Sequence, residues 1–288
     1  MRFIFLLIIG QALTGVMSAQ NTPCKYDEKT LQFIGTPVEQ ARCLLRPNLI
    51  GGVLANELSK LPKPFEKLIG QLTVLRNVKV RNYLNKHHIQ DDAVGGSLDL
   101  PLSGGTLPNG DKFPALYFII HDTSSPYLKD APFPENFDTD TGWKGNDLSI
   151  WLKRPVAHIF VNRLGESTTT TPFAETVRSG WGTKFSRDYH KADGKGLQLH
   201  IELVQPRRRD PAGGPENDLI APKPGFTDKQ YERLALLYIC ASVRRGSWMI
   251  PAYHSAIDAG IKDAHDDPQN FELKKFADAL EKLLKQLD

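Results

Sequence analysis

Three strand-like segments followed by two long helical segments constrain the fold of this chain most strongly. Residues 115–120 form a continuous apolar run, residues 157–161 form another, and residues 197–204 alternate apolar and polar side chains. Such patterns are typical of buried and half-buried strands. Residues 227–246 and 273–287 carry apolar side chains at helical spacing, and the former begins with a capping-box pattern and ends at a glycine. We therefore predict an α/β fold with a mixed central β-sheet flanked by helices.

The first 19 residues are typical of a secretory signal peptide. Arg2 is their only charged residue, an apolar run follows it, and Ser18 and Ala19 supply small residues near the expected cleavage site. An unbroken membrane span needs about 20 apolar residues, and polar and glycine residues interrupt this run. We therefore predict a periplasmic or secreted protein with no stable membrane insertion after cleavage.

Length and charge limit the organisation and the partners. The chain has 288 residues, so a main domain with a smaller companion is expected. We assign residues 20–112 to a small, mainly helical N-terminal region and linker, and residues 113–288 to the main domain. Within the former, Thr36 to Glu39 read as a capping box with a first-turn proline and predict a helix from Pro37 to about Leu45. The formal net charge of +3 argues against nucleic acid as a partner.

The three cysteines fall into two groups. Cys24 and Cys43 lie near the start of the expected mature chain and could form a disulfide in an oxidising compartment. Cys240 lies in an apolar helical stretch, where we expect a buried, unreactive thiol.

Two histidines at the ends of apolar segments are candidate metal ligands. His121 ends the first strand-like run, and His254 follows another apolar stretch. Hydrolytic zinc sites use three His and carboxylate ligands plus an open position. Spacing alone leaves several residues open as the third ligand, namely Asp258, Asp263, His265, Asp266 and Asp267. The chain contains no HExxH, GxSxG, P-loop or GxGxxG motif, which disfavours the corresponding enzyme classes.

From Phe113 onward the chain resembles the zinc-dependent N-acetylmuramoyl-L-alanine amidases, which are related to phage-lysozyme amidases and peptidoglycan recognition proteins. Four motifs carry the resemblance, in this order: Ile120-His121, His158 to Gly165, Ile201-Glu202-Leu203, and His254 followed by Asp267-Pro268 and Phe271. The resemblance implies an amidase-like fold with one zinc ion bound by His121, His254 and Asp267. It also implies that Glu202 orients the attacking water, and that His265, or alternatively Lys262, stabilises the oxyanion.

The remaining polar and aromatic candidates are assigned more loosely. The resemblance suggests a site-lining or structural role for His158. Trp181 is a candidate for lining a groove for sugar or peptide, with partly buried packing as the alternative. The run Arg207 to Arg209 is read as a solvated loop.

The functional expectation is therefore an exported enzyme that acts on peptidoglycan or muropeptides. It would hydrolyse the amide bond between N-acetylmuramic acid and L-alanine. The alternative is a non-catalytic peptidoglycan-binding or sensing protein on the same fold.

Overall fold

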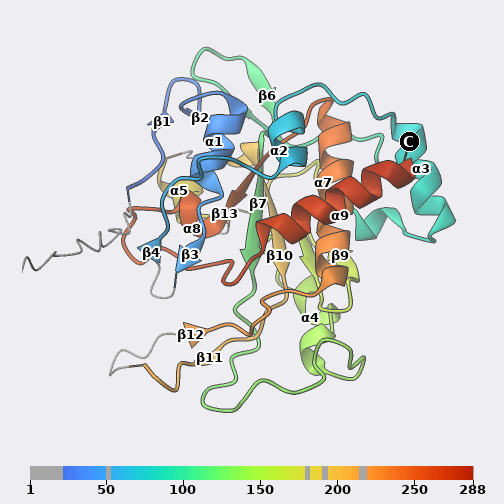
Figure 1. The fold of residues 1–288 in the computed structure, drawn as a ribbon. Helices are drawn as coiled ribbons and strands as arrows, with labels where there is room; N and C mark the ends of the chain where they lie inside the picture. The colour runs from blue at the N-terminus through green and yellow to red at the C-terminus, as the bar shows by residue number, and fades with distance from the viewer. Residues whose placement is uncertain (1–21, 50–52, 179–181, 190–193, 214–218, 288) are drawn as a thin grey trace, which may run out of the picture.

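The computed structural model describes residues 22–49, 53–178, 182–189, 194–213 and 219–287 (Figure 1). Its α-helices are α1 (Pro37–Leu44), α2 (Lys63–Leu68), α3 (Asn77–Lys86), α4 (Ser149–Leu152), α5 (Lys184–Asp188), α7 (Asp228–Arg245), α8 (His254–Ile257) and α9 (Leu273–Leu287). Short 3₁₀ turns η1, η2 and η3 cover Asp91–Ala93, Lys144–Asn146 and Lys195–Leu197. Among these described residues, no helix is both long enough and apolar enough to cross a membrane.

A five-stranded mixed sheet forms the centre of the molecule, in the order β13-β7-β10-β8-β9. These strands are β7 (Tyr117–Asp122), β8 (Ile159–Val161), β9 (Ser167–Thr169), β10 (Gln198–Leu203) and β13 (Ile250–Tyr253). The first four in the sheet order run parallel, and β9 is antiparallel to β8 at the edge. The predicted mixed sheet flanked by helices is therefore confirmed.

The remaining strands form two-stranded hairpins outside this sheet. They pair as β1 (Tyr26–Asp27) with β2 (Gln32–Phe33), β3 (Asn48–Leu49) with β4 (Val53–Leu54), β5 (Gly104–Thr106) with β6 (Lys112–Pro114), and β11 (Arg208–Arg209) with β12 (Leu219–Ile220). All four pairs are antiparallel.

Helices α7 and α9 pack together on one face of the sheet (Figure 1). The ring of Phe118 on β7 meets the ring of Tyr238 on α7 edge to face at 5.3 Å. Both termini of α7 follow the sequence signals, since Thr227 forms a capping box with Gln230 and Gly246 adopts a left-handed conformation at the C-terminus. The expected C-terminal helix is confirmed as α9.

The N-terminal segment covers part of the opposite face. Because side chains alternate along a strand, Tyr117 points away from the side on which Phe118 meets α7. Its hydroxyl accepts a hydrogen bond from the backbone N–H of Phe33 and donates one to Gln40 on α1. Buried residues of the 22–112 range and of the sheet belong to one continuous hydrophobic core.

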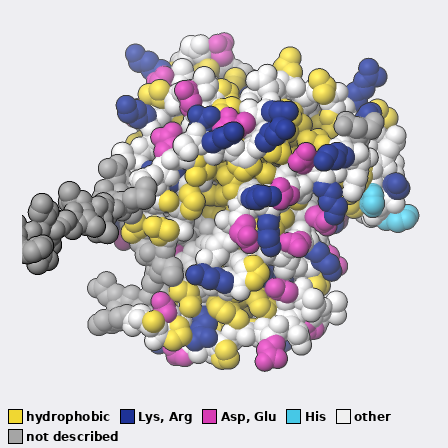
Figure 2. Space-filling view, in the orientation of Figure 1, with side chains coloured by type: hydrophobic (Ala, Val, Ile, Leu, Met, Phe, Trp, Pro, Cys, Tyr) yellow, Lys and Arg dark blue, Asp and Glu magenta, His cyan; other side chains and the backbone are white. Residues whose placement is uncertain are grey.

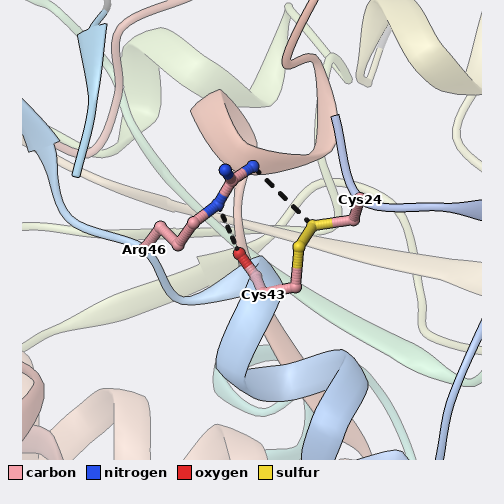
Figure 3. The surroundings of a disulfide bond; sticks show 3 residues. All are labelled: Cys24, Cys43 and Arg46. Atoms are coloured by element: carbon pink, nitrogen blue, oxygen red, sulfur yellow. Dashed lines mark hydrogen bonds between the residues drawn. A yellow bond between two sulfur atoms is a disulfide. The ribbon is translucent and has the colours of Figure 1, made fainter. Parts of the chain in front are cut away.

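The N-terminal segment is fastened by a disulfide between Cys24 and Cys43, as the sequence suggested (Figure 3). Arg46 lies beside this bond, and its Nε donates a 2.9 Å hydrogen bond to the carbonyl of Cys43. Helix α1 ends close to its predicted boundary. Cys240 is buried and unpaired, and burial raises the pKa of its thiol to about 12, which agrees with the expectation of an unreactive side chain.

On the face drawn in Figure 2, basic and acidic side chains intermingle, and no large patch of a single charge is visible. This distribution fits the small formal net charge of +3. A phosphate backbone would find no continuous basic stripe on this face.

Candidate metal centre

The strand arrangement brings His121, Glu202 and His254 to one edge of the sheet. Glu202 on β10 is the register partner of His121 at the end of β7, so both side chains lie on the same face. His254 follows β13 directly, and β13 is the other neighbour of β7. Because the carboxyl ends of parallel strands meet at one edge, residues far apart in sequence converge there.

His121, His254 and Asp267 form a compact set of donor atoms. Nδ1 of His121 lies 2.9 Å from Nδ1 of His254. One carboxylate oxygen of Asp267 lies 2.9 Å from Nδ1 of His254, and the other lies 3.6 Å from Nδ1 of His121. All three side chains are buried, and their ligand atoms lie within 4.8 Å of one another.

The outer nitrogens of both histidines have partners of their own. Nε2 of His254 lies 2.9 Å from a carboxylate oxygen of Asp258 and donates to it. Nε2 of His121 lies 3.0 Å from Nδ1 of His200. When both Nε2 atoms carry protons, both Nδ1 atoms of the neutral rings present lone pairs to each other. A proton or a metal ion between them removes this repulsion, and the three donors are of the types that bind a metal ion such as zinc.

The two imidazoles respond in opposite ways to their surroundings. Burial, together with the neighbouring His254, holds the pKa of His121 well below its ordinary value. Burial also acts to lower the pKa of His254, but the charge of Asp267 and the hydrogen bond to Asp258 outweigh it and raise the pKa well above the ordinary value. Without a metal ion, a proton on His254 therefore neutralises part of the Asp267 and Asp258 charge.

Asp258 is a fully buried anchor behind the donor set. Its two carboxylate oxygens accept hydrogen bonds from the backbone N–H groups of Lys184 and Phe185, at 3.0 and 2.8 Å. These groups belong to the first turn of α5, where N–H groups have no partner within the helix. Burial acts to raise the pKa of Asp258, but its contacts with His254 and His265 and the backbone hydrogen bond from Phe185 outweigh burial and lower the pKa, so the carboxylate stays ionised. Sequence spacing had left Asp258 among the metal-ligand candidates, and in the structure it contacts Nε2 of His254 and forms, with His254 and His265, a second group that could hold a metal ion.

Glu202 lies next to the donor set with part of its carboxylate unused. Its Oε1 is 4.0 Å from Nδ1 of His121. Its Oε2 is buried and has no hydrogen-bond partner among the described residues. Burial, together with the negative charge of Asp267, raises the pKa of Glu202 well above its ordinary value. The raised pKa favours the protonated carboxyl group, which makes Glu202 a candidate for proton transfer.

Asp266 and Asp267 have separate roles although they are adjacent. Asp267 faces the two histidines, whereas Oδ2 of Asp266 lies 3.4 Å from the guanidinium of Arg207. Arg207 also forms a buried 2.7 Å ion pair with Asp122. The expectation of a solvated loop is therefore wrong for Arg207, because only 1% of its side chain is exposed. Arg209 does lie at the surface.

The two candidate oxyanion-stabilising residues lie on the loop that precedes Asp267. The His265 ring packs 4.5 Å from the ring of His254, and 53% of its side chain is exposed. Its Nδ1 lies 3.8 Å from the Asp258 carboxylate. Lys262 is exposed, and its backbone carbonyl accepts a hydrogen bond from the side chain of Lys184.

His158 does not line an accessible site. It is completely buried. Its Nδ1 accepts a hydrogen bond from the backbone N–H of His200, and its Nε2 donates to the carbonyl of Glu175. Burial lowers its pKa to about 4, so the ring is neutral. Of the two roles predicted for His158, its burial favours the structural one over substrate binding, because the ring holds β10 beside the segment that leads into β8.

Trp181 lies outside the described residues, so its assignment to substrate binding stays a prediction.

The sequence interpretation missed the role of His200, whose ring lies against His121. Its signal was its position two residues before Glu202 on an alternating strand, which places both side chains on one face.

Comparison with known proteins adds no assignment: no family model, curated protein or solved structure matches the chain. The fold and site therefore define only the general class. The protein is a mixed α/β protein with a buried His-His-Asp donor set at the carboxyl edge of its parallel strands.

Proposed function

We propose that this protein is an exported zinc-dependent N-acetylmuramoyl-L-alanine amidase with an amidase-like fold. Its substrate is peptidoglycan or muropeptide, and the bond it hydrolyses joins the lactyl group of N-acetylmuramic acid to L-alanine of the peptide stem. The observation that carries the proposal is the unpartnered carboxylate oxygen of Glu202 beside the donor set of His121, His254 and Asp267. The order of the sequence motifs supports the same class, and the signal-like N-terminus supports export.

In the proposed amide hydrolysis, His121, His254 and Asp267 bind the metal ion and Glu202 transfers the proton. Zinc held by His121, His254 and Asp267 would polarise the scissile carbonyl and lower the pKa of water from about 15.7 to about 7. Glu202 accepts a proton from the attacking water and returns it to the leaving amine. Its raised pKa suits both steps, because the group must hold the proton between them.

The charge that develops on the carbonyl oxygen needs a donor from the loop before Asp267. A protonated His265 at the rim of the donor set would oppose that charge. Lys262 is the alternative on the same loop. Replacing each residue by glutamine separates the two, since only the residue that acts on the oxyanion lowers kcat with the metal content unchanged.

The test is mass spectrometry of the products after incubation of purified protein with peptidoglycan. We expect stem peptides that begin with L-alanine, their loss on chelation and their return with added zinc. His254→Ala should abolish both zinc binding and hydrolysis while most of the fold is retained. Wild-type protein that pellets with the wall but releases no peptide would support the non-catalytic binding function instead. Hydrolysis that persists after complete removal of metal would contradict the zinc mechanism.

A further inference from the structure

The hairpin of β1 and β2 packs its aromatic side chains against α5. The ring of Tyr26 on β1 meets the ring of Phe185 on α5 edge to face, with 4.9 Å between the centroids. The ring of Phe33 on β2 stacks on the same Phe185 ring at 5.2 Å. Phe33 and Phe185 are buried, and Tyr26 is half-buried. The hairpin and α5 are therefore packed as one unit, although they lie far apart in the sequence.

Helix α5 in turn holds the carboxylate that lies behind a candidate metal ligand. The backbone N–H of Phe185 donates to Oδ1 of Asp258 at 2.8 Å, and that of Lys184 donates to Oδ2 at 3.0 Å. Oδ2 also accepts the 2.9 Å hydrogen bond from Nε2 of His254. Phe185 thus contacts the hairpin through its ring and Asp258 through its backbone. A shift of α5 would move both backbone donors and so weaken the support of His254.

The hairpin itself is fixed to the part of the fold that carries His254. The disulfide between Cys24 and Cys43 ties the residue range before β1 to α1 (Figure 3). The backbone N–H of Phe33 donates to the hydroxyl of Tyr117 on β7 at 2.8 Å. Helix α1 packs against β13 and α8, and His254 is the first residue of α8. The hairpin therefore connects α5 to the strand and helix that place His254.

We propose that residues 24–43, closed into a loop by the disulfide, form a brace for the metal centre. The brace holds α5 against Asp258 and thereby keeps Nδ1 of His254 directed toward the other donors. Tyr26 is a positioning residue in this arrangement, because it acts on the metal ion through Phe185 and Asp258. The inference rests on the zinc site of the proposed function, and it gives the N-terminal region a role in that site.

The test measures the zinc affinity of Tyr26→Ala by competition with a chromogenic chelator. We expect an affinity about three- to tenfold below wild type, the range that corresponds to the loss of one aromatic pair. Tyr26→Phe keeps the ring and should retain the wild-type affinity. In the Asp258→Asn background, Tyr26→Ala should have no further effect, because the connection to His254 is already broken.

The matched control is Tyr83→Ala. Tyr83 is also a half-buried tyrosine of the N-terminal region, but it lies on α3 with its ring 4.2 Å from that of His87. Helix α3 packs against α7 and α9. This change should leave zinc affinity at the wild-type value. Equal affinities of Tyr26→Ala and wild type would overturn the inference, and so would a full effect of Tyr26→Ala in the Asp258→Asn background.

Removing the disulfide tests the brace from its other end. Cys24→Ser combined with Cys43→Ser opens the loop while the aromatic side chains of the hairpin remain. Zinc affinity should fall in this variant, and again it should not fall further when Asp258→Asn is added. Wild-type zinc affinity in the folded double variant would contradict the role of the loop closure, and Tyr26→Ala tests the hairpin contact with the bond intact.

Amide hydrogen exchange of the metal-free protein separates this inference from the proposed function. The N–H groups of Lys184 and Phe185 should exchange about three- to tenfold faster in Tyr26→Ala than in wild type or Tyr83→Ala. Faster exchange and lower zinc affinity, without turnover of any muramoyl substrate, would support the brace and refute the amidase function. Turnover in a protein whose exchange and zinc affinity are indifferent to Tyr26 would support the amidase function and refute the brace.

Discussion

Asp258 accepts a hydrogen bond from Nε2 of His254, which lies four residues earlier at the start of the same short helix, at 2.9 Å. The same carboxylate accepts two backbone N–H groups from α5. It therefore joins His254, a candidate metal ligand, to a separate segment of the chain. The arrangement fixes a proton on Nε2 of His254 and directs Nδ1 toward His121 and Asp267.

Asp258→Asn is expected to weaken zinc affinity by about 10- to 100-fold, the usual cost of losing such an outer partner. The side-chain amide of the introduced asparagine can turn its NH₂ group toward Nε2 of His254. Because this Nε2 also carries a proton, the two donors would face each other without an acceptor. Competition with a chromogenic chelator measures the effect directly.

The matched control for this change is Asp263→Asn, which removes the same charge from the same loop at an exposed position. Asparagine also tolerates the left-handed backbone found there, with φ of 53°. Equal zinc affinities in the two variants would contradict the positioning role of Asp258.

Zinc affinity is expected to rise with pH in the range below the raised pKa of His254. The metal-free site holds a proton on His254 because the charge of Asp267 and the hydrogen bond to Asp258 outweigh its burial. Zinc must displace that proton from Nδ1. One released proton per ion gives about a tenfold gain in affinity per pH unit, by mass action.

Calorimetry in buffers of different ionisation enthalpy counts the released protons. A pH-independent affinity over this range would show that the site is already deprotonated. The comparison is independent of catalysis, so it also holds for a protein that binds peptidoglycan without cleaving it.

Arg207→Met is expected to destabilise the fold by about 3–5 kcal/mol, because it leaves the Asp122 carboxylate buried without its cation. Asp122 also accepts the backbone N–H of Gln269 at 3.0 Å, two residues after Asp267. The change should therefore loosen the ligand loop as well as the end of β7. Denaturant unfolding measures the free energy.

Arg209→Met provides the control for this change, because Arg209 is half exposed and its nearest carboxylate is the exposed Asp130 at 3.6 Å. Its expected effect is within about 0.5 kcal/mol. Similar losses of stability in both variants would argue against a special role for the Asp122 ion pair.

Local sequence signals predicted the elements well. Capping residues located the start of α1 and of α7, and Gly246 marked the end of α7, because these choices depend on neighbours within one helical turn. Alternation along 197–204 placed Glu202 and His200 on one face, as β10 has them.

Tertiary packing decided what the sequence left open. Asp258 and Asp267 are chemically identical, and only the path of the chain places Asp267 beside Nδ1 of His254 and Asp258 beside Nε2. The Arg207 side chain was assigned to solvent because a basic run is usually exposed, but its partner Asp122 lies 85 residues away in sequence. No local pattern reports such a contact.

Glu202→Gln should have opposite effects on activity and on stability. Glutamine cannot accept and return a proton, so hydrolysis should fall by about 10²- to 10⁴-fold. Zinc content should be unchanged, because the ligands His121, His254 and Asp267 remain. Turnover and metal analysis on the same preparation test both statements.

The stability of the metal-free variant follows from the raised pKa of Glu202. A group with a raised folded-state pKa contributes stability that is present below its ordinary pKa and is lost as pH rises through the raised value. Metal-free wild type should therefore lose stability relative to Glu202→Gln as pH rises from the ordinary carboxyl range. Subtracting the two unfolding curves cancels the other titrating groups, and a pH-independent difference would mean that Glu202 is ionised without penalty in the folded protein.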